Sequence, residues 1–160
     1  MRFFEIVEAD ISWVEDTVSE YFGSPRVVSR GKLHRVRELP GYIAREDANQ
    51  IGMVQYLITG DECEIIVLIS TEPHRGVGRA LIDRVRQRAM SEGCRRIWLI
   101  TTNDNREAIH FYSSLGWKQK AIHRGAVRKS RKLKPEIPEF GSDGTPIEDE
   151  IEFELILEGG

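Results

Sequence analysis

The order of apolar and polar residues predicts a strand-rich first half of the chain. Weak alternation over residues 3–8 predicts a strand, and a helix follows over residues 11–21 with Asp10 as its N-cap. Three further segments, separated by turn residues, predict the strands of an antiparallel meander: residues 41–46, 51–59 and 62–70. Residues 65–69 are apolar without alternation, so we expect the third of these strands to be covered on both faces. Residues 24–40 are basic and predict no defined element.

The second half of the chain alternates between helical and strand periods. One stripe of a helix is predicted by the residues Gly78, Leu81, Ile82, Val85 and Ala89. A strand at 97–101, a helix from Asn105 that ends at Gly116, and a strand at 117–123 follow. Apolar residues that alternate with glutamates predict a last, half-exposed strand: Ile151, Phe153 and Leu155. Residues 125–146 contain three prolines and predict a long loop or short helix inserted before that strand.

Together these elements predict one domain over residues 1–160. The strand, helix and strand over residues 62–102 form a parallel crossover inside an otherwise antiparallel sheet. We therefore expect the α/β (or α+β) class, with a central mixed, mostly antiparallel sheet, one parallel crossover, and helices on both faces.

Composition narrows the classes of function. The chain has 160 residues, 40% hydrophobic and 31% charged, and no apolar run approaches the ~20 residues that span a membrane. The acidic start has no apolar stretch of the kind found in an export signal. Cys63 and Cys94 are interpreted as small core residues that form no disulfide. We therefore expect a cytoplasmic protein. The net charge of −3 argues against nucleic acid as a partner. The basic stretch from Arg124 to Lys134 is a local exception: either a solvated helical face or a contact for phosphate or an acidic substrate.

One turn of the chain is suited to bind a phosphate. A buried strand ends at Ser70, and the amphipathic helix begins after residues 75–80, Arg-Gly-Val-Gly-Arg-Ala. The first turn of a helix has free N–H groups and the positive end of the helix dipole, and glycines let an anion approach the backbone. The glycine pair alone also fits simple tight packing. No Gly-Lys-Ser/Thr follows, which excludes a Walker loop, and Leu81 stands where a dinucleotide fingerprint has its third glycine.

A second, more specific group of residues lies further along the chain, over residues 105–117. Asn105 is a good N-cap, and Tyr112 follows two turns later on the same helix. Each residue also has a purely structural interpretation: capping alone for Asn105, and a packed core aromatic for Tyr112.

The chain resembles the GNAT superfamily of acyl-CoA-dependent N-acyltransferases in two motifs. They are Gly76-Val77-Gly78-Arg79-Ala80-Leu81 and Asn105-x-x-Ala108-x-x-Phe111-Tyr112-x-x-x-Gly116-Trp117. The resemblance is close over residues 50–123. It implies an acetyltransferase that uses acetyl-CoA as cosubstrate and no metal.

The resemblance also implies roles for individual residues. The backbone of one strand would pair with the pantetheine arm of CoA, Asn105 would hydrogen-bond that arm, and Tyr112 would donate a proton to the departing thiolate. The strand residues are Val67, Leu68 and Ile69. The backbone N–H groups that would hold the pyrophosphate belong to Arg75, Gly76, Val77, Gly78, Arg79 and Ala80. The family's Gln or Arg three residues before the first glycine corresponds either to Pro73 or, in the other register, to Arg75.

The acceptor half of the reaction is less defined by the sequence. Four residues are candidates for the general base, each of them equally open to a structural role: Glu64, His123, Asp149 and Glu150. Residues 125–146 are expected near the acceptor, which would be a small-molecule or protein amine, with neither nucleic acid nor membrane as a partner. A homodimer, a non-catalytic acyl-CoA-binding domain and a nucleotide-binding module remain as alternatives.

Overall fold

The structure, a computed structural model, describes residues 1–72 and 75–157. Within these ranges a seven-stranded sheet has the order β1-β4-β5-β6-β7-β9-β8, and β2 and β3 form a separate hairpin. The strands of the large sheet are β1 (Arg2–Glu5), β4 (Gly41–Glu46), β5 (Asn49–Thr59), β6 (Glu62–Ser70), β7 (Arg96–Thr102), β8 (Lys118–His123) and β9 (Glu150–Ile156). The hairpin strands are β2 (Arg26–Ser29) and β3 (Lys32–Arg35). The α-helices are α1 (Ile11–Phe22), α2 (Val77–Ser91), α3 (Arg106–Ser114) and α4 (Ala126–Leu133).

The sheet has the mixed topology that the sequence predicts. Neighbouring strands are antiparallel except for β6 and β7, which are parallel and are connected through α2. The α/β class with a mostly antiparallel sheet and one parallel crossover is therefore confirmed.

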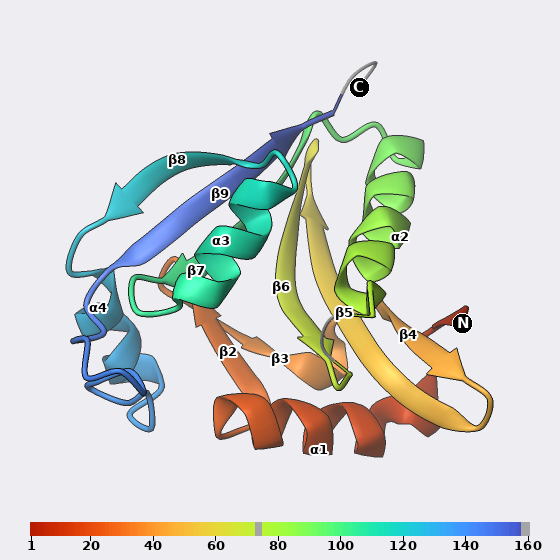
Figure 1. Cartoon of the computed structure of the whole chain (residues 1–160), viewed down its shortest axis with the longest axis horizontal. Helices are drawn as coiled ribbons and strands as arrows, with labels where there is room; N and C mark the ends of the chain where they lie inside the picture. The colour runs from red at the N-terminus through yellow and green to blue at the C-terminus, as the bar shows by residue number, and fades with distance from the viewer. Residues whose placement is uncertain (73–74, 158–160) are drawn as a thin grey trace.

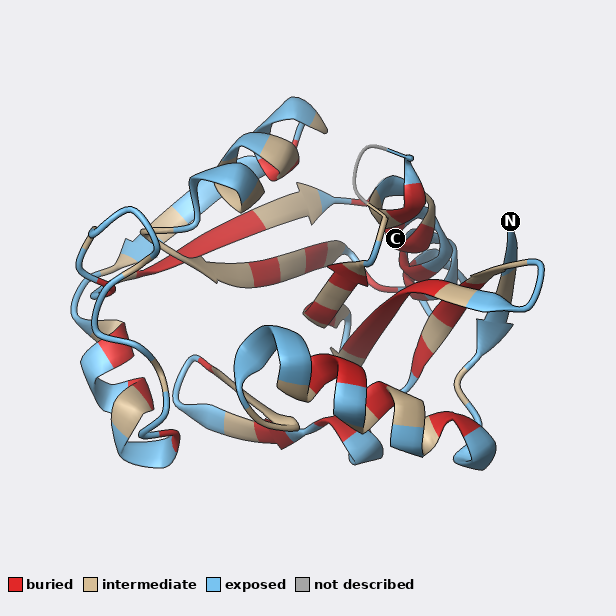
Figure 2. Ribbon diagram, turned by 60° about the horizontal axis from the view of Figure 1, so that its bottom comes forward, coloured by how far each residue is buried: buried red, intermediate tan, exposed pale blue. Residues whose placement is uncertain are grey.

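Helices cover both faces of this sheet (Figure 1). On one face, α2 and α3 pack through Leu81, Val85 and Tyr112 into the larger core cluster. On the other face, α1 packs through Val14 and Val18 against β4, β5 and β6. Buried residues follow the strand centres and the inner sides of the helices (Figure 2). No helix in the described part of the chain is long and apolar enough to cross a membrane.

The two halves of the sheet separate between β6 and β7. These strands pair only over Glu62–Ile65 and Arg96–Leu99, within the described residues, and then diverge. Just beyond the last pair, β6 carries a bulge: Tyr56 of β5 pairs with Ile65 and Gln55 pairs with Val67, so Ile66 has no partner opposite it. The divergence leaves one edge of β6, from Ile66 to Ser70, without a β7 neighbour.

One glycine fixes how closely α2 approaches the sheet. A Cβ atom on Gly52 of β5 would lie 2.7 Å from Val77 Cγ1 and 2.8 Å from the carbonyl oxygen of Ile69. Only a residue without a side chain fits there, so Gly52 allows the first turn of α2 to lie directly over the end of β6.

The structure differs from the sequence prediction in three places. Residues 24–40 contain the β2–β3 hairpin, whose two-residue turn is Arg30 (φ 49°) and Gly31 (φ 76°). Strand β5 begins at Asn49, not at Ile51. Asp10 stands at the predicted N-cap position of α1, but its carboxylate makes no capping hydrogen bond there and instead accepts hydrogen bonds from the Val7 backbone N–H and from Arg45.

Candidate active site

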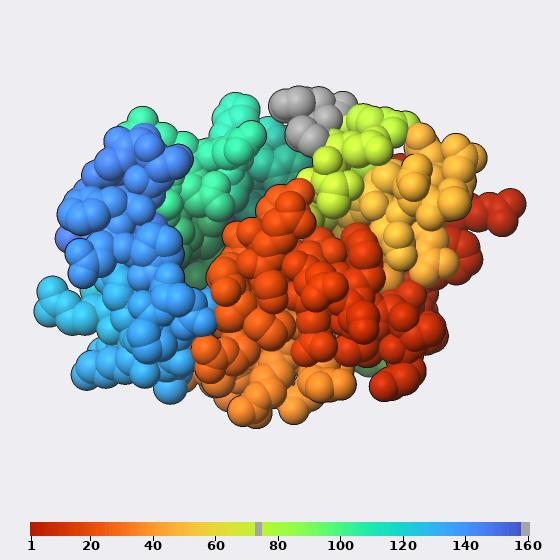
Figure 3. Space-filling model, turned by 90° about the horizontal axis from the view of Figure 1, so that it is seen from below, coloured from red at the N-terminus to blue at the C-terminus, as the bar shows by residue number. Residues whose placement is uncertain are grey.

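A cavity of about 540 Å³ occupies the gap where β6 and β7 diverge. Ile65, Ile66 and Leu68 line it from β6, and residues 99–102 line it from β7. On one side it meets α3, through Asn105, Ala108 and Tyr112. On the other side it meets the end of α1, strand β2, α4 and the residues that lead into β9. Figure 3 shows the α1–β3 region beside the segment that contains α4, with a recess between them.

The N-terminus of α2 has the backbone arrangement expected of an anion site. Gly76 is its N-cap with φ +75°, and no side chain caps the helix. The first backbone hydrogen bond of the turn runs from Ala80 N–H to Gly76 O, so the N–H groups of the residues between them have no partner within the helix. The Arg75 guanidinium is directed to carboxylates, with 2.8 Å to both oxygens of Glu46 and a further contact to Glu72. Pro73, the other candidate for this motif position, lies outside the described residues.

Gly78 lies where α2 faces both β6 and α3. A Cβ atom at this position would meet Phe111 Cζ at 3.5 Å and Leu68 Cδ2 at 3.9 Å, which are ordinary contacts. Leu68 also lines the cavity, whereas Val67 and Ile69 point into the core beneath α1. The phosphate turn and the exposed edge of β6 are therefore adjacent parts of one surface.

The start of α3 shows that Asn105 has the capping role. Its Oδ1 accepts a hydrogen bond from Ala108 N at 3.1 Å. This cap uses only the side-chain oxygen, so the amide nitrogen can still donate to a ligand. The side chain is exposed at the edge of the cavity.

Tyr112 is both a core residue and a cavity residue. Its ring packs at 5.5 Å from Trp117 and 5.9 Å from Phe153, measured between ring centroids. It is 7% exposed, and it also lines the cavity. Burial raises the pKa of its phenol above the ordinary value, so the group stays protonated near neutral pH.

Two buried glutamates lie on the opposite side of the β6–β7 gap. Glu64 accepts a hydrogen bond from Ser29 Oγ at 2.6 Å, and burial raises its pKa to about 7, against the effect of the Ser29 hydrogen bond. The negative charge of Glu150 adds to this rise. Glu150 itself lines the cavity and accepts hydrogen bonds from Arg30 Nη1 at 3.2 Å, from the Arg30 backbone N–H at 3.4 Å, and from Ser130 Oγ at 3.5 Å.

The other two candidate bases are held in structural contacts. His123 Nε2 lies 2.9 Å from Glu152 Oε1, and Arg96 contacts the same glutamate at 3.0 Å. Burial alone would raise the pKa of Glu152, but the hydrogen bonds from His123 and Arg96 outweigh it and lower the pKa. Asp149 accepts a hydrogen bond from the Gly125 backbone N–H at 2.9 Å. Of the four candidate bases, Glu150 alone lines the cavity between β6 and β7.

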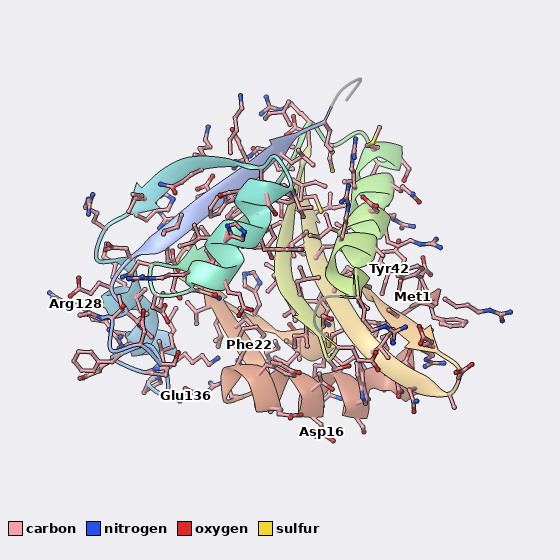
Figure 4. The ribbon with its side chains drawn as sticks, viewed as in Figure 1. Met1, Asp16, Phe22, Tyr42, Arg128 and Glu136 are labelled. Atoms are coloured by element: carbon pink, nitrogen blue, oxygen red, sulfur yellow. The ribbon has the colours of Figure 1, made fainter. Side chains whose placement is uncertain are left out.

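The basic stretch contains two cations that donate hydrogen bonds to backbone carbonyls. Arg131 donates to the carbonyl oxygens of Pro138 at 2.7 Å and Ile147 at 2.8 Å. Lys134 is 5% exposed, and its Nζ donates to the carbonyl oxygens of Phe22 at 2.7 Å and Arg26 at 2.8 Å. For the buried Lys134, both sequence interpretations are wrong. Arg128 remains exposed on the outer side of α4 (Figure 4).

The acceptor side contains residues that the sequence prediction missed. The β2–β3 turn carries Ser29 and Arg30, which contact Glu64 and Glu150, and the end of α1 contributes Tyr21 and Phe22 to the cavity. Figure 4 shows Phe22 and Glu136 close to the place where the end of α1 meets the segment after α4. The turn of this hairpin is Arg-Gly, which is not one of the usual two-residue hairpin signals, and each flanking strand has only four residues, so the sequence contains little indication of it.

Comparisons with known proteins agree with this fold. A sequence model of the acetyltransferase (GNAT) family matches residues 8–117. The uncharacterized protein YdhI of Bacillus subtilis (strain 168) is 40% identical over 144 residues, which cover 89% of this chain and 90% of YdhI. An IAA acetyltransferase from Bacillus cereus has a TM-score of 0.71 and 17% identity, over 98% of this chain and 99% of that one. A Bacillus subtilis acetyltransferase in complex with CoA has a TM-score of 0.68 and 18% identity, over 98% of this chain and 97% of that one.

The extent of the family match shows that the chain belongs to the GNAT family of acetyltransferases. It is therefore an enzyme of the acyl-CoA-dependent acetyltransferase class.

Proposed function

We propose that the chain transfers an acetyl group from acetyl-CoA directly to the primary amine of an acceptor. The observation that carries this proposal is the single cavity at the β6–β7 divergence, which connects the α3 side, with Tyr112, to the side that holds Glu150. Two substrates that enter from opposite faces of the sheet would meet there without a covalent enzyme intermediate. A solved acetyltransferase of this fold with CoA bound supports CoA as the carrier.

The donor would lie along α2, β6 and α3. In this proposal the free N–H groups at the start of α2 bind the pyrophosphate, because the helix dipole and the glycines favour an anion there. The backbone edge of residues 67–69, which has no β7 partner, pairs with the pantetheine arm. The amide nitrogen of Asn105 donates to the same arm.

Tyr112 would assist the departure of the thiolate. Its phenol is protonated at neutral pH, and it reaches the cavity from α3. A thiol has a pKa near ~8.5, below that of the phenol, so complete proton transfer at equilibrium is unfavourable. We therefore assign to Tyr112 a hydrogen bond that strengthens as negative charge develops on the sulfur.

Glu64 would take the proton of the attacking amine. A free alkylamine has a pKa near ~10 and must lose a proton before or during attack. A carboxylate with a pKa of about 7 is a far better proton acceptor than an ordinary glutamate, and it is still largely ionised above neutral pH. The Glu64 side chain does not itself line the cavity, so in this proposal a water molecule relays the proton to it. Glu150, which receives hydrogen bonds from Arg30 and Ser130, attracts the cationic form of the acceptor.

The test measures donor binding and turnover separately. Thermal shift with acetyl-CoA, CoA and NAD should show stabilisation by the first two alone. Release of free thiol from acetyl-CoA should then depend on a primary amine, with the N-acetylated amine identified by mass spectrometry. Stabilisation by NAD would contradict the donor site. Tight acetyl-CoA binding without turnover of any amine would favour a non-catalytic acyl-CoA-binding protein.

A further inference from the structure

Arg30 stands at a turn position that favours other residues. The two-residue turn between β2 and β3 has Arg30 at φ 49° and Gly31 at φ 76°, so both residues are in the left-handed region. Turns of this kind favour Asn-Gly or Asp-Gly, because the left-handed conformation brings the Cβ of most other residues too close to the backbone. The turn therefore gives no reason of its own for an arginine, and the contacts of the side chain supply one.

The Arg30 side chain binds a carboxylate of the cavity. Its Nη1 donates to Glu150 Oε1 at 3.2 Å, and its backbone N–H donates to the other carboxylate oxygen at 3.4 Å. Ser130 of α4 adds a third, longer contact at 3.5 Å. Glu150 is 3% exposed and lines the cavity, whereas Arg30 is not among the residues that line it, and its side chain is 41% exposed. Arg30 therefore acts on the acceptor side through Glu150.

Several charged groups from other elements surround Glu150. Glu64 of β6 is close enough for the two negative charges to interact, and Lys32 of β3 acts on Glu64 in the opposite sense. His123 of β8 lies opposite Glu150 in the strand register. Two neighbouring carboxylates disfavour each other's ionisation, and the guanidinium of Arg30, in ion-pair contact with Glu150, offsets this effect. Further charged residues line the same cavity or act on Glu64: Asp104, Glu136, Lys134 and Glu152.

We propose that Arg30 is a positioning residue for the acceptor: its guanidinium keeps the Glu150 carboxylate ionised and in place at the cavity wall, where that carboxylate binds the ammonium of the incoming amine. The inference rests on the proposed acetyl transfer and adds the residue that prepares the carboxylate. A carboxylate accepts hydrogen bonds at about four positions, so the donors of Arg30 and Ser130 leave room for the acceptor. Arg30 itself contributes no group to the chemical step.

Arg30→Asn tests this role, because asparagine suits a left-handed position and keeps the backbone N–H. The amine is whichever of four the wild type uses best: phenethylamine, spermidine, L-lysine or phenylalanine amide. At pH 7 we expect kcat/KM for that amine to fall about 10-fold through its KM, with the KM for acetyl-CoA unchanged. The deficit relative to the wild type should shrink at pH 9, where Glu150 ionises without the guanidinium. A deficit that is the same at both pH values would indicate a merely structural role and would overturn the proposal.

A double variant tests whether Arg30 acts through Glu150. In the Glu150→Gln background, Arg30→Asn should change kcat/KM for the amine by less than about twofold, because the carboxylate that it serves is already absent. Equal losses in the two backgrounds would contradict the proposal. Arg30→Lys, which keeps the positive charge, should retain more of the wild-type kcat/KM than Arg30→Asn does. If asparagine lowers the melting temperature, Arg30→Met takes its place in the same comparison.

Arg35→Asn is the matched control. Arg35 is exposed at the opposite end of the same hairpin, where it pairs with Arg26, so the substitution removes an equal charge far from Glu150. It should leave both KM values and the pH dependence unchanged, and equal effects of the two arginine variants would count against a specific role of Arg30. Failure of all four amines with acetyl-CoA bound would refute the proposed function. Normal turnover by the wild type and by Arg30→Asn alike would refute only the positioning role.

Discussion

Replacing Glu64 by glutamine should remove activity and, above neutral pH, stabilise the protein. The side chain is 8% exposed, and glutamine keeps its size and an oxygen that can accept the Ser29 hydrogen bond. What the substitution removes is the negative charge. Because burial raises the pKa of Glu64 from 4.5 to about 7, the folded protein holds this proton more tightly than the unfolded chain does.

The sign and size of the stability change follow from this difference. Between pH 4.5 and about 7 the folded state binds more protons than the unfolded state, so the free energy of unfolding falls as the pH rises. At 1.36 kcal/mol for each pH unit, the loss amounts to about 3 kcal/mol at pH 8. The glutamine variant does not ionise and avoids this loss. It should therefore be more stable than the wild type by up to about 3 kcal/mol at pH 8 and by less than about 1 kcal/mol at pH 5.

Urea unfolding at the two pH values, followed by tryptophan fluorescence, measures the free energy of unfolding. Glu152→Gln is the matched control: because the pKa of Glu152 is lowered from 4.5, its charge stabilises the folded state above that pH, and the variant should lose stability at both pH values. In kinetics, Glu64→Gln should lower kcat by about 100-fold or more and abolish the rise of activity around pH 7. A glutamine variant that is less stable than the wild type at pH 8, or that keeps full kcat, would refute the assignment of Glu64 as a buried base.

Three further variants test the remaining parts of the site. Tyr112→Phe should lower kcat by about 10- to 1000-fold, measured by steady-state kinetics, with little change in the KM for acetyl-CoA. A rise in KM alone would contradict the assistance that we assign to Tyr112 in thiolate departure. Gly78→Val should weaken acetyl-CoA binding at least about 10-fold in a titration, whereas Gly78→Ala, whose Cβ meets only ordinary contacts, should bind nearly normally. Lys134→Met should lower the free energy of unfolding by about 1–3 kcal/mol, because it leaves the carbonyls of Phe22 and Arg26 without their donor, and an unchanged unfolding midpoint would contradict this.

The donor half of the site could be predicted from sequence because its features are local. The start of α2 can be predicted from glycines that follow a buried strand. The start of α3 can be predicted from an N-cap residue followed by apolar residues at helical spacing. Each lies within one turn or one helix, and the spacing of residues along the chain determines which side chains share a face. The predicted cap at Asn105 and the burial of Tyr112 follow from the same periodicity.

The acceptor half could not be predicted because its contacts join distant parts of the chain. Ser29 donates a hydrogen bond to Glu64, which lies 35 residues further along the sequence, and Arg30 donates one to Glu150, which lies 120 residues further along. A glutamate in an alternating strand is usually solvated, and only the placement of the β2–β3 hairpin over β6 and β9 buries these two. The basic stretch shows the same limit: its composition predicts a charged surface, but the carbonyls that surround Lys134 belong to α1 and β2.

The cavity and the free edge of β6 depend on one feature, the point at which β6 and β7 stop pairing. The last two residue pairs between these strands are Glu64 with Trp98 and Ile65 with Leu99. If pairing continued past Ile65, β7 would cover the edge of β6 that we assign to the donor. The bulge of β6 at Ile66, in its pairing with β5, follows directly after the last β6–β7 pair, and a bulge bends the strand that carries it, so it favours divergence at this point.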